Sequence, residues 1–285
     1  MIQQYLRARR GNRRCGDFDP TADRTTPDHR SEIQTLKKLW SDQLEHAARS
    51  SLDVAPMAYV DSHFGIDITL ERHLRVIDLI DPYLHGRVLE WGCHAGLDSC
   101  IFRLRHGDRL ELHGCDVLDP LLYEPFYAFS GLRYTQITHD HLLNYPDDFF
   151  DVVTSDGVLE HVPDDLRSIE EVGRILRPGG IFVLACLPNR YSYTELYHRA
   201  RNGPAHERLY TVGGTRRMLQ RRGFDVTFVR HSFMLPTMLN GLPESVRTAY
   251  QHRQNVIWGA NDLLERAWPL SALASNLMLV ATKAG

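Results

Sequence analysis

Hydrophobic and polar positions along the chain follow two different periods, one typical of helices and the other of strands. From Ser31 to about Leu52, apolar residues recur every three or four positions, which predicts a helix with one buried face. A second stretch of this kind runs from Leu70 to about Ile80. We expect it to end there because Pro82 disfavours the helical conformation in the residue before it. Two amphipathic helices are therefore predicted ahead of the rest of the fold.

From Arg87 to Thr194, short apolar runs alternate with helical patterns, which is typical of parallel β-α-β units. The predicted strands are Arg87–Glu90, Leu110–Cys115, Leu132–Thr138, Val152–Ser155 and Ile181–Leu187. The helix between the last two is expected to bury Leu166, Ile169, Val172 and Leu176. Its end is predicted at Arg177–Gly180, because proline stops helices and glycine accepts a positive φ.

The remainder of the chain continues this pattern and adds two insertions. A helix is predicted at Thr211–Arg222, and strands at Phe224–Val229 and Asn276–Thr282. The predicted fold class is α/β, a doubly wound, seven-stranded, mostly parallel sheet with N-terminal helices and a helical cap insertion. Its expected parts are a disordered arm at 1–30, helices at 31–85, and the sheet domain at 86–285 with cap insertions near 189–210 and 234–274.

Charge and cysteine content narrow the kind of partner and compartment. The chain has 33 Lys and Arg against 36 Asp and Glu, a net charge of −3, which argues against a nucleic-acid-binding face. The arginines between Arg7 and Arg14 are interpreted as a solvated arm. Five cysteines form no CxxC pair, so we expect a reducing, cytoplasmic location without disulfides. Neither a signal peptide nor an apolar run that spans a membrane is expected.

A glycine-rich turn follows the first predicted strand. Residues Val88–Gly96 read Val-Leu-Glu-Trp-Gly-Cys-His-Ala-Gly, and glycines there let the backbone approach a ligand closely at a helix start. A carboxylate at Glu90 would repel a pyrophosphate and attract a cation. His94 stands where the dinucleotide-binding fingerprint has a glycine. The turn therefore favours a ligand that carries positive charge.

Polar residues also follow the next three strands. Asp116 lies 24 positions after Gly92, about the spacing at which such folds place a carboxylate on ribose hydroxyls, although a turn-capping role is the alternative. Asp140, after the third strand, is suited to accept from an exocyclic amine such as that of adenine. Ser155 and Asp156 lie at the carboxyl end of the fourth predicted strand, next to the crevice where doubly wound sheets bind ligands.

Several linked motifs resemble the class I S-adenosylmethionine-dependent methyltransferases, particularly the ubiquinone-biosynthesis and related small-molecule types. They are Glu90–Gly96, Phe150–Val153, Leu159–Asp164 and Arg174–Gly180, and Arg222–Val226 is similar to the start of the family's sixth strand. The resemblance implies a Rossmann-like fold, an enzyme, and S-adenosylmethionine as cofactor. The ammonium and sulfonium of that cofactor agree with an acid at Glu90. The sequence departs from the family at His94, where a glycine is usual.

The resemblance also implies roles for individual residues. Glu90, Gly92, Cys93 and Gly96 would surround the methionine moiety, Asp116 and Val117 the ribose and adenine, and Asp140 and His141 the adenine. The backbone at Ser155 would border the donor methyl, and Trp91 and Asp156 complete the expected cofactor-binding set.

Methyl transfer from a sulfonium is an in-line displacement, so most of the acceleration can come from positioning. A hydroxyl or ammonium acceptor must also lose a proton, which suits a histidine. His161 is the first candidate, because an aligned histidine acts as the base in similar phospho-base methyltransferases; a capping or packing role is the alternative. His206 is the second candidate, with an exposed loop position as its alternative. Asp156, Glu160 and His161 could together offer ligands to a divalent ion, but no metal is expected, since Glu160 and His161 are adjacent and would not face one ion together.

The expected activity is methyl transfer to O or N of a small-molecule acceptor, such as a metabolite or natural product. Two alternatives stay open: a non-catalytic protein that binds the cofactor or docks a partner, and an enzyme that uses the same cofactor on a lipid or macromolecular acceptor. We expect a small-molecule partner, no nucleic acid and no transmembrane segment, and a homodimer is left open.

Overall fold

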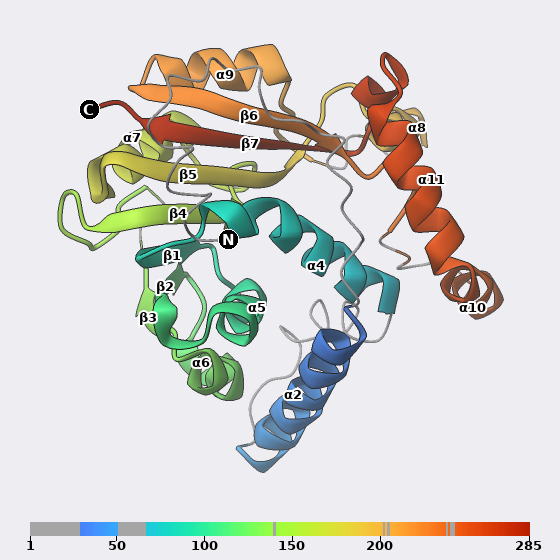
Figure 1. The fold of residues 1–285 in the computed structure, drawn as a ribbon, viewed down its shortest axis with the longest axis horizontal. Helices are drawn as coiled ribbons and strands as arrows, with labels where there is room; N and C mark the ends of the chain where they lie inside the picture. The colour runs from blue at the N-terminus through green and yellow to red at the C-terminus, as the bar shows by residue number, and fades with distance from the viewer. Residues whose placement is uncertain are drawn as a thin grey trace, which may run out of the picture.

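The structure is a computed structural model that describes residues 29–50, 67–138, 141–201, 203, 206–237, 239 and 243–285. A central sheet separates two layers of helices (Figure 1). Its strands are β1 Arg87–Trp91, β2 Glu111–Asp116, β3 Arg133–Gln136, β4 Phe150–Asp156, β5 Leu176–Pro188, β6 Phe224–Ser232 and β7 Asn276–Lys283. Their order across the sheet is β3-β2-β1-β4-β5-β7-β6. Only β7 runs against its neighbours β5 and β6, so the predicted seven-stranded, mostly parallel fold is confirmed.

The helices fill the connections between these strands. They are α2 Arg30–Arg49, α4 Asp67–Ile80, α5 Leu97–His106, α6 Glu124–Ser130, α7 Asp165–Ile175, α8 Tyr193–Arg201, α9 Val212–Gln220, α10 Glu244–His252 and α11 Gln254–Arg266. Short 3₁₀ helices lie at η1 Asp81–Tyr83, η2 Gly107–Arg109, η3 Pro120–Tyr123 and η4 Leu270–Leu273. None of the helices among the described residues is long and apolar enough to cross a membrane.

Two hydrophobic cores lie on opposite faces of the sheet, because successive strand residues point to opposite sides. On β1, Val88 packs into the core under α2, α4, α5 and α6, whereas Leu89 packs into the core under α7 and α9. On β5, Val183 and Phe182 divide in the same way. The strands are thus buried on both faces, and ligands can reach the sheet only at its edges and strand ends.

The helix α7 differs from its predicted register. Asp164 is the N-cap and accepts from the backbone N–H groups of Leu166 and Arg167, so Leu166 lies in the first turn and is 41% exposed. The helix ends at Ile175, and Leu176 starts β5 by pairing with Phe150. The predictions that Leu166 and Leu176 lie on the buried face of this helix were therefore wrong.

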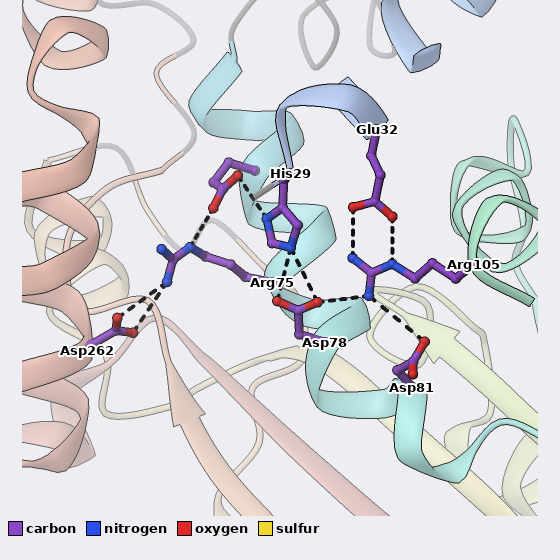
Figure 2. Close-up of polar contacts among 8 residues, drawn as sticks. His29, Glu32, Arg75, Asp78, Asp81, Arg105 and Asp262 are labelled. Atoms are coloured by element: carbon purple, nitrogen blue, oxygen red, sulfur yellow. Dashed lines mark hydrogen bonds and ion pairs between the residues drawn. The ribbon is translucent and has the colours of Figure 1, made fainter. Parts of the chain in front are cut away.

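The start of α2 is fixed to the rest of the fold by a group of charged residues (Figure 2). His29 is 2% exposed, and its ring nitrogens lie 3.0 Å from Glu71 and 3.2 Å from Asp78, both on α4. Arg105 of α5 lies 2.8 Å from Asp78 and 2.8 Å from Glu32 on α2. The arm predicted at 1–30 lies outside the described residues up to position 28, and its last two residues belong to this folded region.

Candidate active site

A cavity of about 480 Å³ lies at the carboxyl ends of the parallel strands, and its volume is within the range of roughly 300–1,000 Å³ that ligand sites occupy. Its walls come from α4, the turn after β1, the end of β4, the end of β5, α8, and the loop after β6. The sequence-predicted residues that line it are Glu90, Gly92, Cys93, Asp156, His161 and His206. The strand ends therefore bring together residues from the turn after β1 and from the insertion near 189–210.

The turn after β1 depends on glycine at position 92. Gly92 has a φ of 71°, and a Cβ atom added there would lie 2.3 Å from Cγ2 of Val158. The backbone N–H groups of Gly92 and Cys93 both donate to the carbonyl of Cys115 on β2, at 2.8 and 3.1 Å. Gly96, with a φ of 70°, then precedes α5. The turn is thus held against β2 with its backbone open to the cavity.

His94 occupies this turn in a left-handed conformation, with a φ of 45°. A backbone of that kind favours glycine, which accounts physically for the family's usual residue. Here the strain is offset by bonds: the backbone N–H of His94 donates to Asp116 at 2.8 Å, and the hydroxyl of Tyr127 donates to its carbonyl at 2.5 Å. His94 lines the cavity, and burial lowers the pKa of its imidazole, which favours the neutral form.

Acidic side chains crowd the methionine end that the resemblance predicted. Glu90 is 8% exposed and accepts from both the backbone N–H and the hydroxyl of Ser99. Burial raises the pKa of Glu90 to about 8, despite those two bonds. Asp98 and Asp156 lie 3.9 and 4.0 Å from Nδ1 of His73 on α4.

His73, Asp98 and Asp156 form a cluster in which one potential metal-ligand atom from each side chain lies within 4.8 Å of the others. The sequence suggested Asp156, Glu160 and His161 as the only potential metal ligands here, whereas the structure groups Asp156 with His73 and Asp98. Cationic groups of a bound cofactor would be stabilised next to the acids of this cluster as well.

Asp116 holds the turn by its carboxylate. Beyond its bond from His94, it accepts from the backbone N–H groups of Val117 at 2.7 Å and Leu118 at 3.3 Å. This geometry is that of the turn-capping alternative, although each carboxylate oxygen can accept more than one hydrogen bond. Val117 is 53% exposed beside it, and neither residue lines the cavity.

The remaining cofactor candidates that the structure describes do not line the cavity. Trp91 is 1% exposed and packs its ring against Phe182, so its side chain belongs to the core. Ser155 pairs with it across β1 and β4 and is also buried, so any cofactor contact of either would be through the backbone. His141 is half-buried after β3, and Asp140 lies outside the described residues.

The two histidine candidates differ in how they are held. The side chain of His161 is 71% exposed, and its Nε2 lies 4.0 Å from a Glu160 oxygen, too far for a hydrogen bond. His206 Nδ1 lies 2.5 Å from Oε1 of Glu195, a side chain that is 4% exposed. A carboxylate on one ring nitrogen fixes the orientation and tautomer of a histidine and leaves the other nitrogen for chemistry. Position 206 is thus the better oriented of the two.

Sequence patterns did not indicate several other residues of the site. Arg72 and His73 belong to an amphipathic helix, and Glu195 belongs to the cap insertion predicted near 189–210. Arg72 donates to Sγ of Cys186 at 3.0 Å and stacks its guanidinium 4.6 Å from the centre of the Phe233 ring. A charged residue on an otherwise apolar helical face, such as Arg72 on α4, is a sequence signal that could have indicated a contribution to the site.

The architecture now defines a class of protein: a Rossmann-like α/β domain with a ligand site at the carboxyl ends of its strands. Residues 89–184 match the family described as a methyltransferase domain. A solved S-adenosylmethionine-dependent methyltransferase from Thermotoga maritima superposes with a TM-score of 0.52 at 14% identity, covering 75% of this chain and 89% of that one. At that identity the likeness shows a common fold.

Curated relatives match over the same region. A protein of Mycolicibacterium smegmatis named as a probable S-adenosylmethionine-dependent methyltransferase is 35% identical over 36% of this chain and 41% of its own length. The ubiquinone biosynthesis O-methyltransferase of Aeromonas salmonicida is 29% identical over 38% and 46%. The chain thus spans less than half the length of these two relatives. Residues 89–184 thus match a methyltransferase domain and resemble S-adenosylmethionine-dependent methyltransferases in sequence, as the motifs indicated.

Proposed function

We propose that this protein transfers the methyl group of S-adenosylmethionine to a nitrogen or oxygen of a small-molecule acceptor. The observation that carries the proposal is that the turn around Gly92 and the His206–Glu195 pair line the same cavity. A site of this volume suits a cofactor end and a small acceptor rather than an extended polymer.

In this proposal the methionine end of the cofactor lies against the turn after β1. The carboxylates of Glu90 and Asp98 stabilise its positive charges, and Arg72 is the nearby cation for its carboxylate. Asp116 keeps the turn in place and offers its remaining lone pairs to the ribose. When bound, the cofactor supplies a methyl group that is already activated by the sulfonium.

His206 removes the acceptor's proton in this account, with Glu195 orienting its ring and stabilising the charge that it gains. A general base needs an accepting nitrogen within reach of the acceptor. Because Nδ1 of His206 is bonded to Glu195, Nε2 is the nitrogen left to accept the proton. His161 is the second candidate base and lines the same cavity. Partial desolvation of its ring and the charge of nearby His206 lower the pKa of His161, which also keeps it able to accept a proton at neutral pH.

The test is methyl transfer from labelled S-adenosylmethionine to a metabolite library, with purified His206→Ala, His161→Ala and the exposed-site control His252→Ala. The base role predicts a maximal rate lower by about a hundredfold in His206→Ala, with cofactor affinity unchanged. His252→Ala should match the wild type. Equal rates in His206→Ala and the control would overturn the assignment. Cofactor binding without transfer to any acceptor would favour the non-catalytic alternative.

We also propose a reducing, cytoplasmic compartment for the protein. In support, the described cysteines Cys93, Cys100, Cys115 and Cys186 are free, and the first three are buried. Burial raises the pKa of the Cys93 and Cys100 thiols, so these side chains are protonated and unreactive.

A further inference from the structure

Two glutamates at the acceptor side of the cavity have one carboxylate oxygen each without a hydrogen-bond donor. Glu160 is 6% exposed and Glu195 is 3% exposed, and both line the cavity. Among the described residues, no side chain or backbone group donates to Oε2 of either one. Buried polar atoms in folded proteins are nearly always paired, since leaving one unpaired costs free energy. Two such oxygens in one cavity point to donors supplied by a ligand.

The two carboxylates reach the cavity from separate elements of the fold, so they converge through tertiary packing and are not neighbours in the sequence. Glu160 lies in the segment between β4 and α7, with its Oε1 beside Gly157, and Glu195 lies in the first turn of α8. The Oε1 of Glu195 is already used by His206. His206 also exerts an electrostatic effect on Glu160, which places the three side chains in one neighbourhood.

The charge of the lining favours a cationic acceptor. Its carboxylates are Glu90, Asp98, Asp156, Glu160 and Glu195. Against these five, the described lining contains a single arginine, Arg72, and no lysine. The cofactor adds only one net positive charge, from an ammonium and a sulfonium less a carboxylate. Burial raises the pKa of Glu90, Asp98 and Glu160, because their ionised forms are costly without a nearby cation. A bound ammonium would offset that cost, whereas a neutral alcohol or phenol would not.

We propose that the acceptor is a small organic amine that is held as its ammonium by Glu160 and Glu195, so the enzyme is an N-methyltransferase. This inference rests on the proposed function and narrows its acceptor class. An ammonium carries up to three N–H donors, enough to satisfy both unpaired oxygens at once. Charge-assisted bonds of this kind are the stronger class of hydrogen bond.

The reaction then balances within the site. The ammonium transfers one proton to the free nitrogen of His206, whose side chain is 39% exposed and can pass the proton to solvent. The freed lone pair on nitrogen forms the N–C bond to the methyl group while the C–S bond breaks. The electron pair of that bond stays on sulfur, and the products are the methylated amine, as its ammonium, and S-adenosylhomocysteine.

Calorimetric titration of the full chain, saturated with S-adenosylhomocysteine, tests the proposal. The probes are ten primary alkyl- and arylalkyl-amines, 2-phenylethylamine among them, each paired with the alcohol of the same skeleton. The isosteric variants Glu160→Gln and Glu195→Gln are compared with Glu170→Gln, whose side chain is 61% exposed on α7 and pairs with Arg222. Unchanged affinity for S-adenosylhomocysteine shows that each variant has folded.

The proposal expects amines to bind and their alcohols to bind at least tenfold more weakly. Each cavity variant should weaken amine binding by about tenfold or more, while Glu170→Gln leaves it unchanged. Alcohols that bind as well as amines, amine affinities untouched by both cavity variants, or a panel in which no amine binds would overturn it. Failure of S-adenosylhomocysteine itself to bind would instead contradict the proposed function.

Discussion

Single residues in the turn after β1 decide whether the backbone there can meet a ligand. Gly92 combines a left-handed φ with a space that leaves no room for a Cβ beside Val158, and His94 adopts a left-handed φ although it is not glycine. The structure offers a comparison within the same chain. Gly107 also has a positive φ of 57°, but nothing lies within 4 Å of an added Cβ there.

Gly92→Ala is expected to abolish S-adenosylhomocysteine binding and to lower the free energy of unfolding by more than Gly107→Ala does. The control carries only the backbone strain of its φ of 57° and ψ of −138°, about 1–3 kcal/mol, whereas position 92 adds a steric overlap with Val158. Urea unfolding and calorimetry on both variants measure the difference. If the two variants bind and unfold alike, the close packing at Gly92 does not shape the site.

Substitution of Asp116 can distinguish a ribose-binding role from a turn-capping role for this residue. Asp116→Ala removes the acceptor of backbone N–H groups at His94 and Val117, so it is expected to cost about 1–3 kcal/mol of stability. If the residue also contacts the ribose, affinity for S-adenosylhomocysteine should fall at temperatures where the variant is fully folded. A loss of stability with unchanged affinity would show that capping is its whole role.

The sequence identified those site residues whose chemistry is tied to a local motif. Glu90 and Gly92 could be predicted because a strand, a turn and a helix follow one another within a few positions. The pairing of Glu195 with His206 could not, because it depends on how an insertion folds back over the strand ends. His206 was consequently ranked behind His161, although the structure holds His206 in the more defined orientation.

At the scale of elements, the packing of α2 on α4 depends on a histidine between two carboxylates. Burial by itself would lower the pKa of His29, but the hydrogen bonds and charges of Asp78 and Glu71 raise it to about 9 from 6.5. Because the folded-state pKa is the higher one, the stabilisation is fully present below pH 6.5. It is lost as the pH rises through 9.

The free energy of unfolding should therefore fall by about 3 kcal/mol between pH 6.5 and 9.5 through this group. His29→Gln keeps a polar side chain but cannot become charged, so its stability should change less over that interval. Urea unfolding at both pH values gives the comparison. An equal decline in the wild type and in His29→Gln would remove His29 as the cause.

Elements were predicted well where their hydrophobic period was long and less well where a cap or a strand pairing set the boundary. The helical period alone placed Leu166 and Leu176 on one buried face. The cap at Asp164 and the pairing of Leu176 with Phe150 then assigned these two residues to the first turn of a helix and to a strand. Both effects depend on specific partners, one local and one distant, that a period does not contain.

At the scale of the whole molecule, the site exists because parallel strands end at the same edge of the sheet. Glu90 from β1, Asp156 from β4 and Cys186 from β5 reach one cavity for that reason, and α4 and α8 add walls from outside the sheet. The position of the site therefore followed from the predicted fold. Its acidic lining did not, because the contributions of α4 and α8 depend on tertiary packing.

The most direct test of the central claim is a calorimetric titration of the full chain with S-adenosylhomocysteine, with a nicotinamide dinucleotide as the comparison ligand. The account predicts one binding site with a dissociation constant of about 1–100 μM, typical of enzyme ligands, and no measurable binding of the dinucleotide. An acid-lined turn should repel a pyrophosphate and accept the cofactor's ammonium. Dinucleotide binding of equal strength, or the absence of S-adenosylhomocysteine binding by folded protein, would contradict the account.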